Sequence, residues 1–292
     1  MTAMTTSSHP SPPYLYSPIT ERPPIAWPGG ARVAMYVGLN VEHFLPDLPS
    51  TSIWPGSAEL QPDALNHGWR DYGARVGIWR TVESLDRHGI RPSVLLNSMV
   101  VEHYPQIVAA GVERDWAWLA HGRTNSTLHT GLTPEDERQV LTEITDTIQT
   151  ATGRAPRGWM GPGLTETHQT PSLLTELGYQ YVLDWTNDDQ PYPLTVPGMI
   201  SVPYTVELND LVLFGRGLTG PDFLQMVVDT YEQLHADSAA GGRVMTIALH
   251  PFVIGQPFRH KYLDQALAFL AAQPDIWLTT SDDIAAHYLE QS

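Results

Sequence analysis

The sequence predicts an α/β fold in which parallel strands and helices alternate around one sheet. Apolar runs of strand length alternate with segments of helical periodicity about seven times, without an internal break. Several of these runs are apolar throughout, which is typical of parallel strands covered on both faces. A length of 292 residues suits one large barrel, so the pattern favours a single (β/α) barrel over two domains.

Composition limits the classes of partner. The net charge of -16 argues against nucleic acid, because binding to a phosphate backbone needs clustered Lys and Arg. No apolar run reaches the roughly 18 residues that a membrane span requires. The chain has no cysteine, which excludes disulfides, thiolate zinc sites and cysteine nucleophiles. We therefore expect neither nucleic acid nor a membrane as a partner.

Residues 1–28 predict an extended N-terminal arm, followed by the barrel at residues 29–292. The arm is rich in Ser, Thr and Pro and has neither the basic start nor the apolar segment of a signal peptide. We therefore expect a cytoplasmic protein. Tyr14, Tyr16 and Trp27 are large for a solvated tail. We expect the arm to lie across a neighbouring subunit of a homodimer or homotetramer.

The first half of the barrel contains three apolar runs that predict strands, at residues 31–39, 92–97 and 115–120. Residues 72–88 have apolar positions at helical spacing and end at Gly89, a helix-stop signal. Ser98 can cap a helix that runs to residue 111. Residues 44–69 are rich in Pro, Ser and Asp and predict a long irregular loop, which is usually functional or mobile at that length.

The second half begins with a clear helix start, since Thr133 can cap a first turn of Pro134, Glu135 and Asp136. That helix is expected to end near Gly153. Further apolar runs predict strands at residues 157–160, 179–183, 199–203, 243–249 and 276–279. Helical periodicity predicts helices at residues 170–177, 221–236, 261–272 and 281–289.

Polar residues with catalytic chemistry follow several of these strands. They are Asn40, Glu42, Asn97, His121, Asp184, Asp188, Asp189 and His250. In parallel α/β proteins, active sites lie where the strands end. Asn40 and Glu42 are two apart and share a face of an extended chain, so the carboxylate could serve as a metal ligand or a general base. A lone acid of this kind is more often a solvated loop residue.

The two histidines also have more than one interpretation. His121 and Asn125 are four apart, so on a helical turn they would point the same way, as paired metal ligands do. An amide, however, is a poor zinc ligand. His250 is fixed by the proline that follows it, a good position for a proton donor, although a buried histidine can simply bond a backbone carbonyl. Asp184, Asp188 and Asp189 could orient such a histidine or only complete a turn.

Several motifs together resemble one family. They are Trp27-Pro28-Gly29-Gly30-Ala31-Arg32-Val33, Leu39-Asn40-Val41-Glu42, Tyr72-Gly73-Ala74-Arg75-Val76-Gly77, Arg157-Gly158-Trp159-Met160-Gly161-Pro162-Gly163, Asp184-Trp185 and Leu249-His250-Pro251. The chain resembles the polysaccharide deacetylase (NodB homology, carbohydrate esterase 4-like) superfamily. Within it, the chain resembles the branch of allantoinases and cyclic-imide hydrolases. The resemblance implies a distorted (β/α)7 barrel.

The resemblance also assigns roles. In metal-dependent members, one aspartate is the base, and a second aspartate and the pair His-x3-His hold the metal. The matching positions here are Asn40, Glu42, His121 and Asn125. The Asn-x-Glu pattern of residues 40–42 resembles the form of this motif found in the allantoinase-type members. His250 matches the family's general acid. We therefore expect no metal. The alternative is one divalent, zinc-like ion held by Glu42, His121 and Asn125.

The sequence thus predicts a hydrolase of non-peptide carbon–nitrogen bonds that acts on a small linear or cyclic amide. The alternatives are a metal-dependent N-acetyl-sugar deacetylase and a non-catalytic binding protein on the same barrel. The expected catalytic residues are Asn40, Glu42, His121, Asp188 and His250. The expected substrate-binding residues are Asn97, Asn125, Arg157, Trp159, Trp185, Asp189 and Tyr192.

Overall fold

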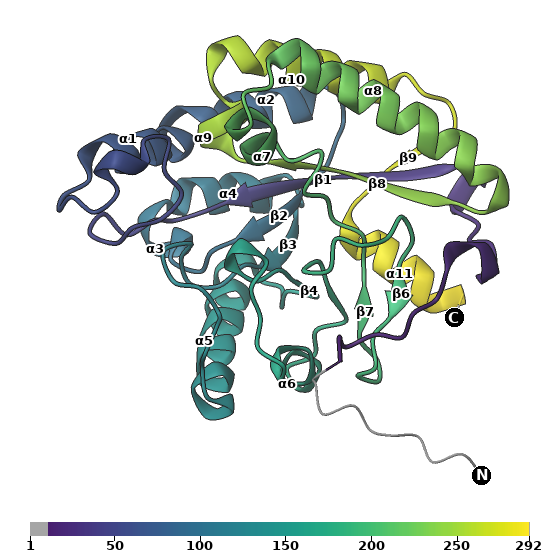
Figure 1. Ribbon diagram of the computed structural model, residues 1–292, viewed down its shortest axis with the longest axis horizontal. Helices are drawn as coiled ribbons and strands as arrows, with labels where there is room; N and C mark the ends of the chain where they lie inside the picture. Colours follow the sequence, from purple (N-terminus) through teal and green to yellow (C-terminus); the bar gives the residue numbers. More distant parts are fainter. Residues whose placement is uncertain (1–10, 292) are drawn as a thin grey trace.

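A computed structural model describes residues 11–291 of the chain. Its strands are β1 (Val33–Val41), β2 (Ser93–Leu96), β3 (Ala117–Ala120), β4 (Gly158–Trp159), β5 (Tyr181–Val182), β6 (Tyr192–Pro193), β7 (Ile200–Ser201), β8 (Arg243–Leu249) and β9 (Ile276–Leu278). They form one sheet in the order β6-β7-β5-β4-β3-β2-β1-β8, with β9 also paired to β1. Pairing is parallel except between β6 and β7. The sheet curls into an incomplete barrel (Figure 1), which confirms the predicted fold class.

The helices lie outside this curled sheet. They are α1 (Ala64–Tyr72), α2 (Ile78–Arg87), α3 (Val100–His103), α4 (Pro105–Glu113), α5 (Pro134–Thr152), α6 (Thr170–Glu176), α7 (Asp210–Gly215), α8 (Gly220–Asp237), α9 (Pro251–Ile254), α10 (Pro257–Ala271) and α11 (Ser281–Gln291). In Figure 1, α2, α8 and α10 cover one side of β1 and β8, and α5 and α6 lie on the opposite side. No helix among residues 11–291 is both long enough and apolar enough to cross a membrane.

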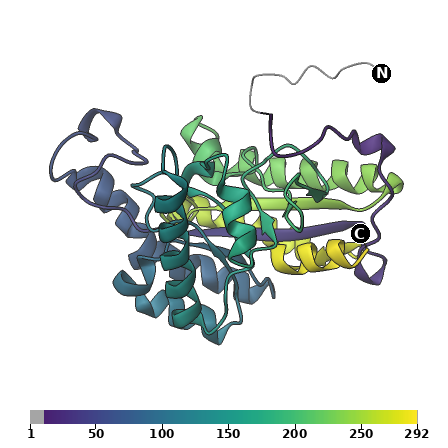
Figure 2. The same cartoon turned by 90° about the horizontal axis from the view of Figure 1, so that it is seen from below.

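The barrel interior is filled by alternate residues of the strands. On β1, Ala34 and Tyr36 belong to an inner core, whereas Val33, Met35 and Val37 belong to the core between sheet and helices. This alternation follows from the period of two along a strand. Seen from below, α11 lies against the sheet near the chain's C-terminal end (Figure 2). Its first residues bond the starts of β2 and β5, so α11 closes the end of the barrel where the strands begin.

Several predicted elements differ from the structure. The predicted helix 72–88 begins earlier, because Asp63 caps α1 by accepting from Asn66 N. The predicted helix 98–111 is broken into α3 and α4 before Pro105, whose ring cannot continue a helix interior. The short helices α7 and α9 and the antiparallel strand β6 were not predicted. Each of these three elements has six residues or fewer, too few for a periodicity to show.

A single turn of π-helix, Gly73–Gly77, joins α1 to α2. It lies against α9, and a Cβ added to Gly77 would stand 2.0 Å from the carbonyl oxygen of Pro251. Only glycine permits this approach of the two backbones. The contact connects the α1–α2 segment directly to the residues that follow His250.

We expect Gly77→Ala to lower the free energy of unfolding by about 2 kcal/mol, because the added methyl group must force two backbones apart. Urea unfolding followed by circular dichroism measures this. Gly68→Ala is the matched control, since Gly68 is an exposed position of α1 with no atom near its missing Cβ. The control should be slightly more stable than the parent, as alanine is the better helix former. Equal stability of both variants would contradict the close contact.

The described part of the arm, residues 11–28, packs against its own chain. Tyr14 packs edge-on against Trp185 and Tyr192, with ring centroids 5.1 and 5.5 Å apart. Arg22 forms an ion pair with Asp188 at 2.6 Å. Trp27 is buried and donates its indole N–H to the carbonyl of Arg243. Residues 1–10 of the expected arm lie outside the described residues.

Candidate active site

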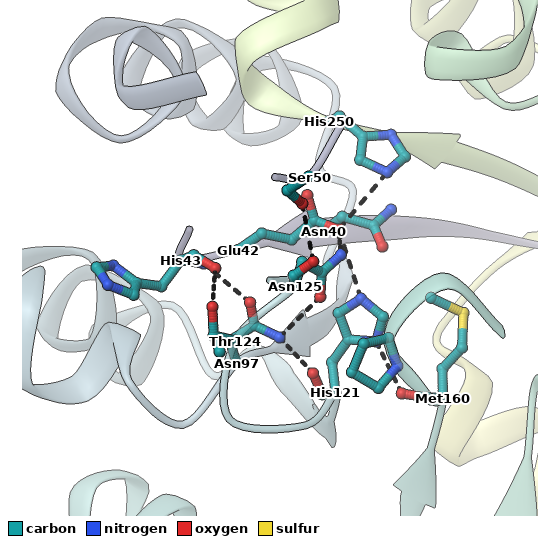
Figure 3. A network of polar contacts seen from close by, with 12 residues as sticks. Asn40, Glu42, His43, Ser50, Asn97, His121, Thr124, Asn125, Met160 and His250 are labelled. Carbon is teal, nitrogen blue, oxygen red and sulfur yellow. Dashed lines mark hydrogen bonds and ion pairs between the residues drawn. The ribbon is translucent and has the colours of Figure 1, made fainter. Parts of the chain in front are cut away.

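The candidate site lies where the strands end, at positions that continue the inward-facing alternation (Figure 3). On β1, the inward residues Ala34 and Tyr36 are followed by Asn40 and then by Glu42, just past the strand. By the same alternation, Leu95 precedes Asn97, Leu119 precedes His121 and Ala248 precedes His250. These strands are neighbours in the sheet, in the order β3-β2-β1-β8. The structure therefore brings together the predicted residues of four strand ends.

Glu42 is at the centre of the group. Its side chain is only 4% exposed, and its Oε1 atom lies 3.4 Å from His121 Nε2 and 3.8 Å from His250 Nε2. The side-chain amide of Asn125 donates a hydrogen bond to the same oxygen. A buried carboxylate between two imidazoles can exchange protons with either of them. This arrangement is suited to general acid–base chemistry.

His121 presents one ring nitrogen to the site. Its Nδ1 lies 2.7 Å from the carbonyl oxygen of Met160, which can only accept, so Nδ1 carries the proton. The Nε2 atom is buried without a hydrogen-bond partner and faces Glu42. In the neutral ring, Nε2 is therefore an acceptor. A water molecule could donate one proton to this nitrogen and the other to Glu42.

His250 is oriented by a residue that the sequence did not indicate. Asp210, which is fully buried, accepts from His250 Nδ1 at 2.7 Å through one oxygen. Its other oxygen accepts from the backbone N–H groups of His250 and Ile254. Burial alone would lower the pKa of His250, but the carboxylates of Asp210 and Glu42 outweigh it, and the net pKa is raised. A raised pKa favours the imidazolium that a general acid requires.

We expect Asp210→Asn to move the alkaline limb of the pH–rate profile to lower pH. The general acid must be protonated, so the rate falls as pH rises through its pKa. Loss of the Asp210 charge lowers that pKa. Measuring kcat/KM from about pH 5 to pH 10 tests this, with thermal unfolding as the check on folding. An alkaline limb at the parent's position would show that Asp210 does not tune His250.

A chain of amides fixes the orientation of Asn125. Asn97 Oδ1 accepts from the backbone N–H of His43 at 2.9 Å, so its Nδ2 is the donor to Asn125 Oδ1 at 3.0 Å. Asn125 must then turn its own nitrogen toward Glu42. Residues 121–125 do not form a helical turn, because the chain bends at Gly122 with a φ of 71°. Asn125 reaches Glu42 from a loop instead.

This amide orientation decides whether the residues fit a divalent ion. Glu42 and His121 could each offer a lone pair, but Asn125 directs an N–H group at the same point, and its oxygen bonds to Asn97. Within residues 11–291, no three His, Asp or Glu side chains are grouped as metal ligands. Zinc sites need at least three good protein ligands. The donor set therefore does not fit a zinc-like ion.

The structure places Asp188 and Asp189 away from this group. The backbone carbonyl of Asp189 accepts from Val244 N, at the start of β8, whereas His250 follows the end of that strand. Six residues of extended chain separate the two points by roughly 20 Å. Asp188 pairs with Arg22 instead, and both aspartates line a separate cavity of about 670 Å³ beside the arm. Catalysis by Asp188 and substrate binding by Asp189 at this site are therefore wrong.

Four other expected substrate-binding residues also lie outside the group. Arg157 precedes β4 and bonds to Gln180, so it lies at the starting end of the strands. Trp159 is fully buried in the core between sheet and helices, while its neighbour Met160 belongs to the inner core. Trp185 and Tyr192 hold the arm through Tyr14. Of the substrate-binding predictions, only Asn97 and Asn125 join the group.

The fold and the site together define a class of protein, a (β/α)-barrel protein with a buried carboxylate–histidine site at the strand ends. Residues 70–182 match the family model of polysaccharide deacetylases. A Schizosaccharomyces pombe protein assigned by name to the polysaccharide deacetylases is 25% identical over 277 residues, covering 88% of this chain and 85% of that protein. Both matches agree with the resemblance to polysaccharide deacetylases that the motifs predicted. Members of this family hydrolyse carbon–nitrogen bonds, which supports the prediction of an enzyme.

Solved structures agree with this fold. A Pseudomonas aeruginosa protein, assigned by name to the same family, superposes with a TM-score of 0.84 at 24% identity, covering 93% of this chain and 95% of that one. The crystal structure of Puue allantoinase superposes with a TM-score of 0.82 at 24% identity, covering 97% and 98%. At this level of identity the likeness shows a shared fold.

Proposed function

We propose that the protein hydrolyses the carbon–nitrogen bond of a small amide, with cyclic imides and ureides as the preferred class. The observation that carries this proposal is the placement of Glu42 between His121 and His250, with the Asn125 N–H group directed at the same oxygen. Such a site can move protons but offers no set of three metal ligands. The similarity to an allantoinase structure supports the same class of substrate.

In the proposed reaction, a water molecule donates its protons toward Glu42 and His121 Nε2. Glu42 takes one proton as the water oxygen bonds to the amide carbon. His250 then protonates the departing nitrogen, and the carbon–nitrogen bond breaks. The Oδ1 atom of Asn40 is buried without a partner, because Asn40 uses its amide nitrogen on Tyr204 and Leu249. That oxygen can accept an N–H group of the substrate.

Imides and ureides suit this chemistry because the nitrogen of the bond to be broken also carries a second carbonyl group, which withdraws the nitrogen lone pair and leaves the acyl carbon more electrophilic. With no Lewis acid in the proposed reaction, the base and the hydrogen-bond donors supply the whole stabilisation of the transition state. An unactivated acetamide would demand more from the same groups. We therefore expect rates to fall from imides through ureides to simple acetamides.

A turnover screen over allantoin, cyclic imides, linear ureides, formamides and acetylated chito-oligomers tests the proposal. Hydrolysis of the small amides supports it. Hydrolysis of the oligomers alone would favour sugar deacetylation over the proposed function. For that reaction, the free Nε2 of His121 offers one metal-ligand position. Saturable binding without turnover of any compound would identify a non-catalytic member of the family.

We expect activity to survive exhaustive dialysis against a chelator. The proposed reaction uses Glu42, His121 and His250 without a bound ion, so removal of divalent cations should leave kcat within a few-fold of its starting value. Elemental analysis of the dialysed protein must accompany the assay. About one equivalent of zinc, with activity lost on chelation and restored by zinc, would contradict the prediction and favour the deacetylase.

A further inference from the structure

Arg70 is a buried cation whose hydrogen-bonding capacity is largely unused. It lies on α1 and is 3% exposed. Its Nη1 donates to the carbonyl of Thr51 at 2.6 Å, whereas Nε and Nη2 are buried without hydrogen-bond partners. The guanidinium stacks over the ring of Phe44 at 4.9 Å, which holds its plane. Folded proteins seldom leave buried donors unmet.

The neighbouring carboxylates do not satisfy these donors. Asp63 already accepts from Ser57 Oγ and from both nitrogens of Asn66. Glu42 is close enough to act on Arg70 electrostatically but accepts its hydrogen bond from Asn125. The fork formed by Nε and Nη2 is the geometry that binds carboxylates through two parallel hydrogen bonds.

This fork lies beside the reacting groups. Arg70, Asn40 and Glu42 line one cavity of about 20 Å³, closed on its apolar side by Phe252 and Ile107. A space of that size holds a single polar atom of a ligand. Glu42 takes its proton from the water molecule whose oxygen becomes part of the product acid. The carboxylate of that product therefore lies next to the carboxylate of Glu42. A second cation is needed there to offset the repulsion.

We propose that Arg70 binds the acyl oxygen of the substrate and retains the carboxylate formed when the ring opens. This inference rests on the proposed function. Water supplies the new carbon–oxygen bond, and one of its protons passes to Glu42. The departing nitrogen takes a proton from His250. The resulting carboxylic acid releases its remaining proton to solvent, and Glu42 returns its proton to His250.

The test uses succinamate, the ring-opened product of succinimide, and succinamide, its neutral isostere. Calorimetry should show the parent binding succinamate about 10- to 100-fold more tightly, as expected for hydrogen bonds to a charged group. Arg70→Gln should abolish that preference, and Arg70→Lys should retain part of it, because an ammonium keeps the charge but loses the fork. Arg75→Gln, at an arginine whose side chain is 74% exposed, should bind like the parent.

Equal affinities for the two compounds in the parent would overturn the inference, as would an unchanged preference in Arg70→Gln. If the glutamine variant does not fold, Arg70→Lys replaces it as the test variant. A lysine variant with the same preference for succinamate as the parent would also overturn the inference. The binding test requires no turnover. The absence of hydrolysis in the substrate screen would therefore refute the proposed function separately from the carboxylate site.

Discussion

Glu42→Gln should reduce kcat by about 10³-fold, with a much smaller change in KM, because the amide cannot accept the proton of the attacking water. Glutamine has nearly the same volume and can still contact Asn125, so the packing of this buried position is retained. The assay is steady-state hydrolysis of the best substrate from the screen. Intact folding is checked by thermal unfolding.

The control for this variant is Glu232→Gln, an exposed glutamate on α8, which should leave the rate unchanged. Removing the Glu42 carboxylate also removes one of the two charges that raise the pKa of His250. Residual activity should therefore decline at lower pH than in the parent. A variant that keeps kcat within a few-fold of the parent would show that Glu42 is not the base.

His250→Gln should lower kcat by about 10²- to 10³-fold, because glutamine can bond Asp210 but cannot deliver a proton to the departing nitrogen. The size of the loss should depend on the substrate. A weakly basic leaving nitrogen, as in an imide, needs less protonation than the nitrogen of a ureide or a simple amide. The variant should therefore lose less activity on imides.

Comparing the two substrate classes in parallel measures that dependence. His168→Gln, at an exposed histidine before α6, is the matched control and should behave like the parent. An equal loss on every substrate would point to a role for His250 in holding the site together rather than in proton transfer. A rate near the parent's would exclude both roles.

Much of the fold was predictable because its signals are local. The strand at residues 243–249 was predicted with the bounds of β8, since the run between Gly242 and His250 is apolar apart from Arg243 and Thr246. The helix after Thr133 was predicted with its cap, which accepts from Asp136 N, and with its end at Gly153 in the left-handed conformation. Each of these boundaries depends on residues adjacent in the chain.

The site was only partly predictable because its support is not local. Glu42, His121 and His250 follow strands and belong to recognisable motifs. Asp210, by contrast, reaches His250 across 40 positions of the sequence from a short helix with no periodicity. Trp159 was misjudged for a related reason. Its strand has two residues, so no alternation in the sequence showed that Met160, and not Trp159, faces the interior.

The position of β1 has a consequence for synthesis of the chain. β1 is paired with β2 on one side and with β8 on the other, yet β8 is made about 200 residues later. Until then, a strand whose nine residues are all buried in the finished protein has one edge open to any other strand nearby. Helices α2, α8 and α10 cannot complete their packing over it either. The nascent chain would therefore carry an unpaired, aggregation-prone strand edge for most of translation. Exposed edges of this kind are among the features for which nascent chains need chaperones. Truncation before residue 243 should produce insoluble protein rather than a smaller folded domain.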